Sequence, residues 1–162
     1  MLLAAAFLLS VIAPTEPTQP QQAPIKWAIA KAPAAASAGD TIVVQLTAQI
    51  ADGWHLYALV QPSDGPIPTT IAVGPRQVFA LDPKSIEAPE AKEIDDENFG
   101  MRTRHYDASV VFRLPVKIAA TAAGRYDLEV SARYQACSKT ICLKPVTIVR
   151  KTGIRIISAG RK

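Results

Sequence analysis

The sequence has few of the features that mark helical, membrane-spanning or disordered proteins. No stretch repeats its apolar residues with the 3.6-residue period of a helix, and thirteen prolines argue against a helical bundle. The one long apolar run, residues 2–13, falls short of the roughly 20 residues that a membrane-spanning helix needs. Hydrophobic residues make up 49% and charged residues 20% of the chain, which excludes a wholly disordered protein.

The length and the net charge set further bounds. A chain of 162 residues has room for one domain with a core and too little for two ordinary ones. The formal net charge of +4 is mildly basic and does not by itself indicate nucleic-acid binding, so no nucleic-acid partner is expected. We expect a monomer.

The charges are spread unevenly along the chain. Residues 82–97 hold seven acids and two lysines, whereas the chain from residue 98 onward holds thirteen Lys or Arg and three acids. One interpretation is a solvated acidic loop on a basic scaffold; the other is a face that recruits a charged partner.

The N-terminal segments are typical of an exported protein. Residues 1–13 are expected to be a signal peptide, with small residues before a cut after Ala13 or, alternatively, after Ala23. Residues 14–24 are rich in Pro and Gln and predict an extended tether. Residues 25–162 are expected to form the folded domain.

The body of the chain has the two-residue period of β-strands. Residues 41–50, 108–118 and 125–134 alternate clearly between apolar and polar positions. Weaker candidates are residues 26–30, 54–59, 69–73, 144–149 and 154–157. Short strands separated by turn signals predict an all-β, immunoglobulin-like antiparallel sandwich.

Two features interrupt this pattern. Pro115 lies inside a predicted strand, which indicates a sheet edge or a bulge at that position. Residues 82–100 show no strand period, and a loop of that length in a compact domain is usually functional.

Cys137 and Cys142 are the only cysteines, and they lie between two predicted strands. In an exported chain such a pair forms a disulfide, which could be a structural staple or a redox site. A six-residue loop constrains the unfolded chain by only about 2 kcal/mol, which argues against stabilisation as the main purpose. The spacing of the two cysteines leaves both possibilities open. A zinc site that also uses His55 and His105 is disfavoured, because these histidines are 50 positions apart.

Four segments together resemble the DsbD amino-terminal domain family. They are Tyr-Gln-Ala-Cys…Cys-Leu-Lys-Pro at residues 134–145, Asp-Gly-Trp-His-Leu-Tyr at 52–57, Asp-Glu-Asn-Phe-Gly at 96–100 and Leu-Pro-Val at 114–116. They occur in the family's order, and the resemblance covers roughly residues 25–149. The resemblance implies an immunoglobulin-like domain of the bacterial periplasm that relays electrons through a cysteine pair.

The resemblance also implies roles for individual residues. Cys137 and Cys142 would be the redox pair, with Cys142 forming the mixed disulfide and Cys137 resolving it. A long cap loop would shield the pair through Phe99, flanked by Asp96 and Glu97. Tyr57 would line the pocket, with His55 on the same strand face. Lys144 stands where many members have proline, which leaves the shielding geometry to be determined.

The implied partners are thioredoxin-like periplasmic proteins and a membrane-embedded reductase. Because the chain ends at Lys162, we expect the reductase to act in trans, and we expect no cofactor. Two other functions compete with this one. A noncatalytic binding module would use the disulfide only to hold a loop, and a metal-delivery protein would use the cysteines as soft ligands for copper.

Overall fold

The computed structural model describes residues 23–74 and 77–158, which form twelve strands and one short 3₁₀ turn. The predicted signal peptide and most of the predicted tether lie outside the described residues. The elements are β1 (Ile25–Lys31), β2 (Ala35–Ser37), β3 (Thr41–Ile50), β4 (Trp54–Tyr57), β5 (Thr70–Val73), β6 (Phe79–Leu81), η1 (Pro83–Ser85), β7 (Lys92–Asp96), β8 (Met101–Tyr106), β9 (Val110–Ile118), β10 (Gly124–Tyr134), β11 (Ala136–Ser138) and β12 (Val146–Ile157).

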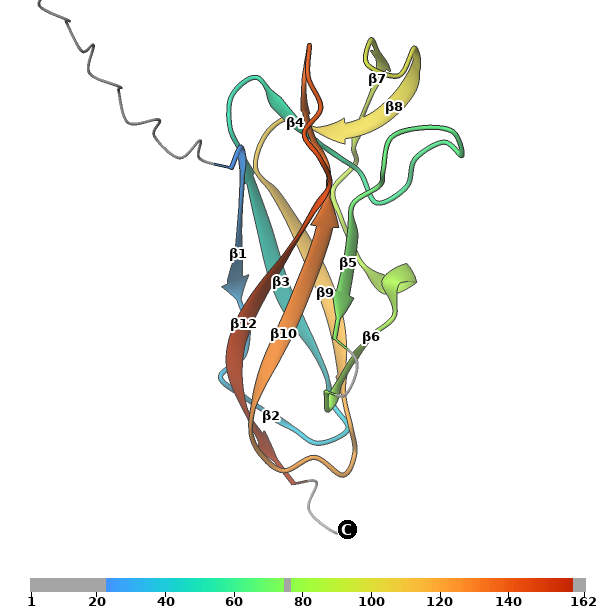
Figure 1. The fold of residues 1–162 in the computed structure, drawn as a ribbon. Coiled ribbons are helices and arrows are strands. Elements are labelled where there is room, and N and C mark those ends of the chain that lie inside the picture. The colour runs from blue at the N-terminus through green and yellow to red at the C-terminus, as the bar shows by residue number, and fades with distance from the viewer. Residues whose placement is uncertain (1–22, 75–76, 159–162) are drawn as a thin grey trace, which may run out of the picture.

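Two four-stranded sheets face each other and form the body of the molecule (Figure 1). One has the order β1-β3-β9-β6 and the other the order β2-β12-β10-β5. All pairings are antiparallel except the short parallel pairing of β12 with β2. The predicted immunoglobulin-like β-sandwich is therefore confirmed. The described residues contain no helix that is long and apolar enough to cross a membrane.

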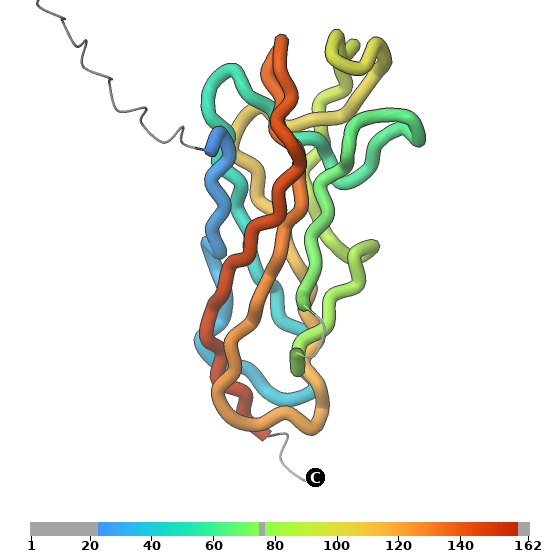
Figure 2. The backbone as a smooth tube through the Cα atoms, in the orientation of Figure 1, coloured from blue at the N-terminus to red at the C-terminus, as the bar shows by residue number. Residues whose placement is uncertain are grey.

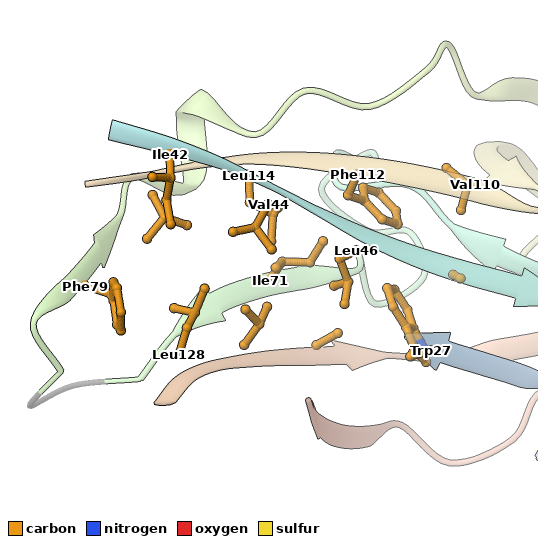
Figure 3. Close-up of a cluster of buried hydrophobic side chains, with 14 of the residues drawn as sticks. Trp27, Ile42, Val44, Leu46, Ile71, Phe79, Val110, Phe112, Leu114 and Leu128 are labelled. Carbon is orange, nitrogen blue, oxygen red and sulfur yellow. The ribbon is translucent and has the colours of Figure 1, made fainter. Parts of the chain in front are cut away.

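The core lies between these sheets and is built from the inward positions of the alternating strands (Figure 3). The side chains of Val44, Leu46, Phe112 and Leu128 are completely buried. Trp27 stacks on Phe112 with ring centroids 5.8 Å apart. Because every second residue of a strand points to the same face, the period of the sequence was enough to identify these inward positions.

The structure corrects the prediction near the C-terminus. The sequence pattern predicts two strands, at residues 144–149 and 154–157, but β12 is one continuous strand that pairs with the whole of β10. Gly153 interrupts the apolar alternation without interrupting the ladder, in which it lies opposite Asp127.

Pro115 lies in β9, between β3 and β6, where it faces Val43. β6 pairs with β9 only as far as Val116, and the next contact on that side is the Glu87–Arg113 bridge. By the alternation of the ladder, the backbone nitrogen of Pro115 points to the gap between these two pairings. Proline has no backbone N–H, but no hydrogen bond of the ladder is lost at this position. The gap is a local edge of the sheet, in agreement with the prediction from Pro115.

A third sheet, of order β11-β4-β8-β7, lies at one end of the sandwich (Figure 1; the same end is traced in Figure 2). The sequence predicts a long loop without strands over residues 82–100, and the structure corrects this in part. This stretch contains η1 and β7, and β7 pairs with β8 as a hairpin. Polar residues occupy both faces of this hairpin, so its sequence lacks the alternation of apolar and polar residues from which strands are predicted.

Candidate functional site

One face of the third sheet carries buried polar side chains. Residues opposite each other on neighbouring strands point to the same side of a sheet, and so do residues two apart on one strand. Cys137 faces His55, and Tyr57 faces His105. The same face continues through Thr103 to Asp96 on β7. The other face, including Leu56, Tyr106 and Ala136, packs on the sandwich core.

The two cysteines flank the tip of a tight hairpin. They form a disulfide, with Cα atoms 4.1 Å apart, and lie opposite each other as an isolated β-bridge. Ser138 N donates to Ile141 O at 2.8 Å, which closes a four-residue turn between the cysteines. Leu143 N donates to Ala136 O at 2.9 Å below the disulfide. Cys137 is 0% exposed, whereas Cys142 is partly exposed. The two cysteines are therefore unequally exposed.

Asp96 is the centre of a buried hydrogen-bond network. Its side chain accepts hydrogen bonds from Tyr57 Oη at 2.7 Å, Thr103 Oγ1 at 3.1 Å and the backbone N–H of Asn98 at 2.9 Å. Asp96 is 3% exposed, so the expectation of a solvated acidic stretch is wrong at this position. A carboxylate that is buried with three donors is stabilised as the anion.

The network shifts the pKa values of its members. Burial acts to raise the pKa of Asp96, but the hydrogen bonds from Tyr57, Asn98 and Thr103, with the nearby His55, outweigh it and hold that pKa below its usual value. Burial and the hydrogen bond to Asp96 raise the pKa of Tyr57 well above its usual value. The pair therefore consists of a carboxylate and a protonated phenol at neutral pH.

The two histidines stack on each other beside this network. The rings of His55 and His105 have centroids 4.7 Å apart, and His55 also packs edge-on against Tyr57. Both are buried, and neither Nε2 of His55 nor Nδ1 of His105 has a hydrogen-bond partner. Burial lowers the pKa of both imidazoles, and for His55 the neighbouring His105 adds to this effect.

Residues 97–100, here called the cap turn, connect β7 to β8. Phe99 N and Gly100 N both donate to the carbonyl of Asp96, and Gly100 has a φ of 62°, which favours glycine. The ring of Phe99 packs edge-on against Tyr57 at 5.8 Å. Asn98 Nδ2 donates to Ser138 O at 3.0 Å, which ties the cap turn to the cysteine hairpin. Glu97 is exposed.

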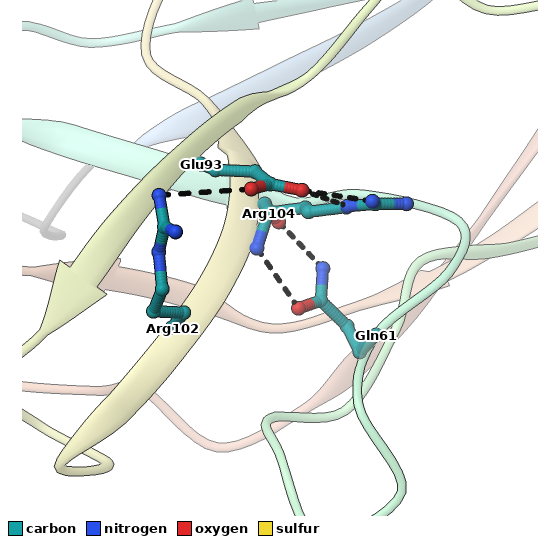
Figure 4. A network of polar contacts seen from close by, with 4 residues as sticks. All are labelled: Gln61, Glu93, Arg102 and Arg104. Atoms are coloured by element: carbon teal, nitrogen blue, oxygen red, sulfur yellow. Dashed lines mark hydrogen bonds and ion pairs between the residues drawn. The ribbon is translucent and has the colours of Figure 1, made fainter.

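On the opposite, solvent-facing side of the β7–β8 hairpin, an acidic side chain forms ion pairs with two arginines (Figure 4). Glu93 binds Arg104 through two hydrogen bonds of 2.8 and 2.9 Å and lies 3.7 Å from Arg102. Arg104 N donates to Gln61 Oε1 at 3.1 Å, which joins the hairpin to the loop after β4. These contacts pair part of the acidic stretch with the basic residues that follow it.

A cleft of about 460 Å³ lies over the polar face. Its lining includes both histidines, Asp96 and Asn98, together with Ser138 and Lys139 from the cysteine hairpin. In the part of the chain that the structure describes, no three or more His, Cys, Asp or Glu side chains gather as metal ligands would.

The structure brings together the residues that the sequence singled out. Cys137, His55, Tyr57 and Asp96 share the polar face, and Phe99 contacts it from the cap turn. Their functional roles stay predictions.

Sequence reasoning missed Thr103 and considered His105 only as a disfavoured zinc ligand, and it gave Asn98 no role of its own. The first two belong to Met-Arg-Thr-Arg-His-Tyr, in which arginines alternate with other residues. This alternation is a strand signal that a search for apolar periods overlooks.

Comparison with known proteins gives a consistent result. The family model described as "Thiol:disulfide interchange protein DsbD, N-terminal" matches residues 21–153. None of the curated proteins compared with the chain matches it.

Solved structures are similar at low sequence identity. The reduced DsbD N-terminal domain of Neisseria meningitidis is 22% identical over 74% of this chain and 82% of its own, with a TM-score of 0.48. A complex between the DsbD and PilB N-terminal domains of N. meningitidis gives 22% identity, coverage of 72% and 77%, and a TM-score of 0.44. The N-terminal periplasmic domain of ScsB from Proteus mirabilis is 17% identical, with a TM-score of 0.51, over 81% of this chain and 45% of its own. This last likeness supports the fold alone.

Proposed function

The chain belongs to the DsbD N-terminal domain family, and we propose that it is a periplasmic thiol–disulfide interchange domain whose Cys137–Cys142 pair passes reducing equivalents to oxidised partner proteins. The observation that carries the proposal is the position of the disulfide. It lies next to the exposed tip of a hairpin, with Cys137 buried on a polar face and Cys142 partly exposed. A staple that only holds a loop needs neither the polar face nor the asymmetry.

The exchange chemistry assigns different roles to the two sulfurs. Thiol–disulfide exchange proceeds by attack of a thiolate on a disulfide sulfur through a mixed disulfide, so the sulfur that meets a partner must be accessible. Cys142 is the accessible one and forms the mixed disulfide. Cys137 is buried and resolves it.

The cap turn shields the pair until a partner docks. Three contacts support this role: Phe99 against Tyr57, Asn98 to Ser138 O, and the backbone hydrogen bonds from the cap turn to Asp96. The tie to the cysteine hairpin is one exposed hydrogen bond, which a docking protein can replace at little cost. Asp96 anchors the turn, and Glu97 is its exposed acid.

The surface beside the pair suits a protein partner. Ile141 is 53% exposed and Val146 46%, and Leu143 is exposed as well. A groove of about 570 Å³ next to them is lined largely by apolar side chains, including Trp54 and Tyr134. Apolar and aromatic side chains next to a partly exposed cysteine are what a thioredoxin-like protein would bury on docking. Reducing equivalents would enter from a membrane-embedded reductase through such a carrier.

Trapping of the mixed disulfide tests the proposal. A thioredoxin-like periplasmic protein that lacks its own resolving cysteine is incubated with Cys137→Ser and with the matched variant Cys142→Ser. The first variant should accumulate a covalent complex through Cys142, and the second should accumulate little. Equal trapping by both would contradict the assigned roles. No trapping across a panel of such proteins would favour the noncatalytic binding module.

A further inference from the structure

A buried imidazole lies directly beside the buried sulfur. His55 on β4 faces Cys137 on β11, so their side chains point to the same side of the sheet with Cβ atoms about 5 Å apart. Cys137 has no exposed surface, and His55 is only 9% exposed. Nε2 of His55 is buried and has no hydrogen-bond partner in the disulfide form.

The chemistry of the buried cysteine requires a proton acceptor. To resolve a mixed disulfide, Cys137 must attack as the thiolate, and burial away from water disfavours that charged form. Water has no access to this sulfur. A buried polar nitrogen without a partner costs free energy, so its presence calls for an explanation. In the disulfide form Cys137 carries no proton, whereas reduction creates an S–H donor on the strand next to the unpartnered nitrogen.

We propose that His55 is the proton acceptor of Cys137 in the resolving step, an inference that rests on the interchange function proposed above. The step starts from the mixed disulfide between Cys142 and the partner. The Cys137 thiol gives its proton to His55 Nε2, and its sulfur attacks Cys142 Sγ. The Cys137–Cys142 bond forms while the Cys142–partner bond breaks. The partner leaves as a thiolate with the electron pair, and His55 returns its proton to solvent.

The neighbouring groups are less suited to this role. Asp96 already accepts three hydrogen bonds, and the resulting stabilisation of its anion makes it a weak base. Tyr57 donates its hydroxyl proton to Asp96. Lys139 is exposed. His105 faces Tyr57 rather than a cysteine, so it lies one strand further from the sulfur.

The surroundings keep the imidazole of His55 neutral and therefore able to accept a proton. Burial and the adjacent His105 lower its pKa, and Asp96 and Asp107 oppose this only in part. Tyr57 packs edge-on against His55, and Lys92 binds Asp107 from outside the cleft. The other charged or titratable groups around His55 line the cleft: Lys139, Asp52, Asp95, Asp96, Glu97, His105 and Asp107.

The rate of the resolving step as a function of pH tests the proposal. The dithiol protein is mixed with glutathione disulfide, quenched in acid and analysed by mass spectrometry, so that decay of the glutathione adduct is followed separately from its formation. With His55 as the base, the decay rate should be nearly independent of pH between 7 and 8.5. His55→Gln should decay about 10²-fold more slowly at pH 7. Its rate should rise about tenfold per pH unit, because hydroxide then creates the thiolate.

The matched control is His105→Gln, which makes the same chemical change on the neighbouring strand. It should keep the flat pH profile, whatever its absolute rate. The proposal is wrong if His55→Gln also shows a flat profile, or if the wild-type profile already rises tenfold per unit. A wild-type adduct that never resolves would remove the interchange function itself, and with it this inference.

A measurement on the unaltered chain covers the case in which His55→Gln does not fold. The ¹⁵N resonance of His55 Nε2 should shift when the disulfide is reduced, because the new thiol then donates to it. The resonance of His105 Nδ1 should move much less. An unchanged His55 resonance on reduction would overturn the proposal.

Discussion

The sandwich body and the small sheet at its end are both built from antiparallel strands, yet they bury opposite kinds of side chain. In the body, the inward positions are apolar without exception along β9 and most of β3. On the polar face of the third sheet, which is turned away from the sandwich core, the buried side chains include Asp96, Thr103, His105 and His55. Of the buried polar side chains among the described residues, only Thr69 lies outside this face.

This difference separates stability from chemistry. Burial of apolar area stabilises the fold, whereas a buried polar group contributes little net stability and is costly when it has no partner. Two imidazole nitrogens on the polar face have no partner. The body therefore supplies the free energy that lets the small sheet keep side chains suited to proton and sulfur chemistry.

The largest loss of stability is expected from a substitution in the core of the sandwich body. Phe112→Ala removes a fully buried ring that packs against both Trp27 and Tyr106, and should lower the free energy of unfolding by about 4 kcal/mol. Urea unfolding followed by circular dichroism measures it. The control Val43→Ala, at a largely exposed position of the same sheet, should cost less than about 1 kcal/mol. Equal losses would contradict the division between body and surface.

Mild acid should lower the free energy of unfolding through the two buried histidines of the small sheet. Burial lowers the folded-state pKa of His55 and His105, so the unfolded chain takes up protons first as pH falls below about 6.5. Stability is complete above this pH and is lost progressively toward the lower folded pKa values, by on the order of 1 kcal/mol between pH 7.5 and 5.

Urea unfolding at the two pH values measures this loss. Between pH 7.5 and 5 the loss can be assigned to His55 and His105, because the chain has no other histidine. His105→Gln should reduce the pH dependence, and a wild-type stability that rises on acidification would contradict the account.

A smaller effect is expected from the hydrogen bond at the centre of the site. Tyr57→Phe keeps the ring but removes the donor to Asp96, which retains Thr103 and Asn98 as partners. The loss of stability should be about 1 kcal/mol, and the pKa of Asp96 should rise toward its usual value. Urea unfolding and NMR titration of the carboxyl group measure the two effects. An unchanged Asp96 pKa would show that the network is held by other contacts.

A substitution in the cap turn should have the smallest effect on stability. It should, however, have a large effect on the reactivity of the cysteines. Phe99→Ala removes a partly buried ring that contacts Tyr57, at a cost of about 1 kcal/mol or less. Alkylation of the reduced cysteines by a bulky maleimide should become several-fold faster, with Val43→Ala as the control. An unchanged alkylation rate would remove the shielding role from Phe99.

The body could be predicted from the sequence because its alternation of apolar and polar residues is regular. The inward residues of β3, β9 and β10 are those that the two-residue period identifies. Long-range pairing could not be predicted in the same way. The continuity of β12 depends on its pairing with β10 and not on its own apolar pattern.

The site could be predicted only in part. Three of the four short motifs contain Cys137, His55, Tyr57 and Phe99, but they do not reveal the sheet that joins these residues. β7 and β8 carry polar or charged residues on both faces, since one face meets solvent and the other forms the buried polar network. A pattern that contrasts apolar with polar positions has no signal in such a hairpin. The partnership of His55 with Cys137 follows from the strand register, which the sequence alone does not fix.

The reduction potential of the Cys137–Cys142 disulfide tests the central claim most directly. The protein is equilibrated in buffers of graded thiol–disulfide potential, quenched by alkylation and scored by mass for the fraction reduced. An exchange-active pair should be half reduced at a potential above about −300 mV. A potential well below that value is typical of a structural disulfide, and would contradict the account in favour of a binding module whose disulfide only holds its loop.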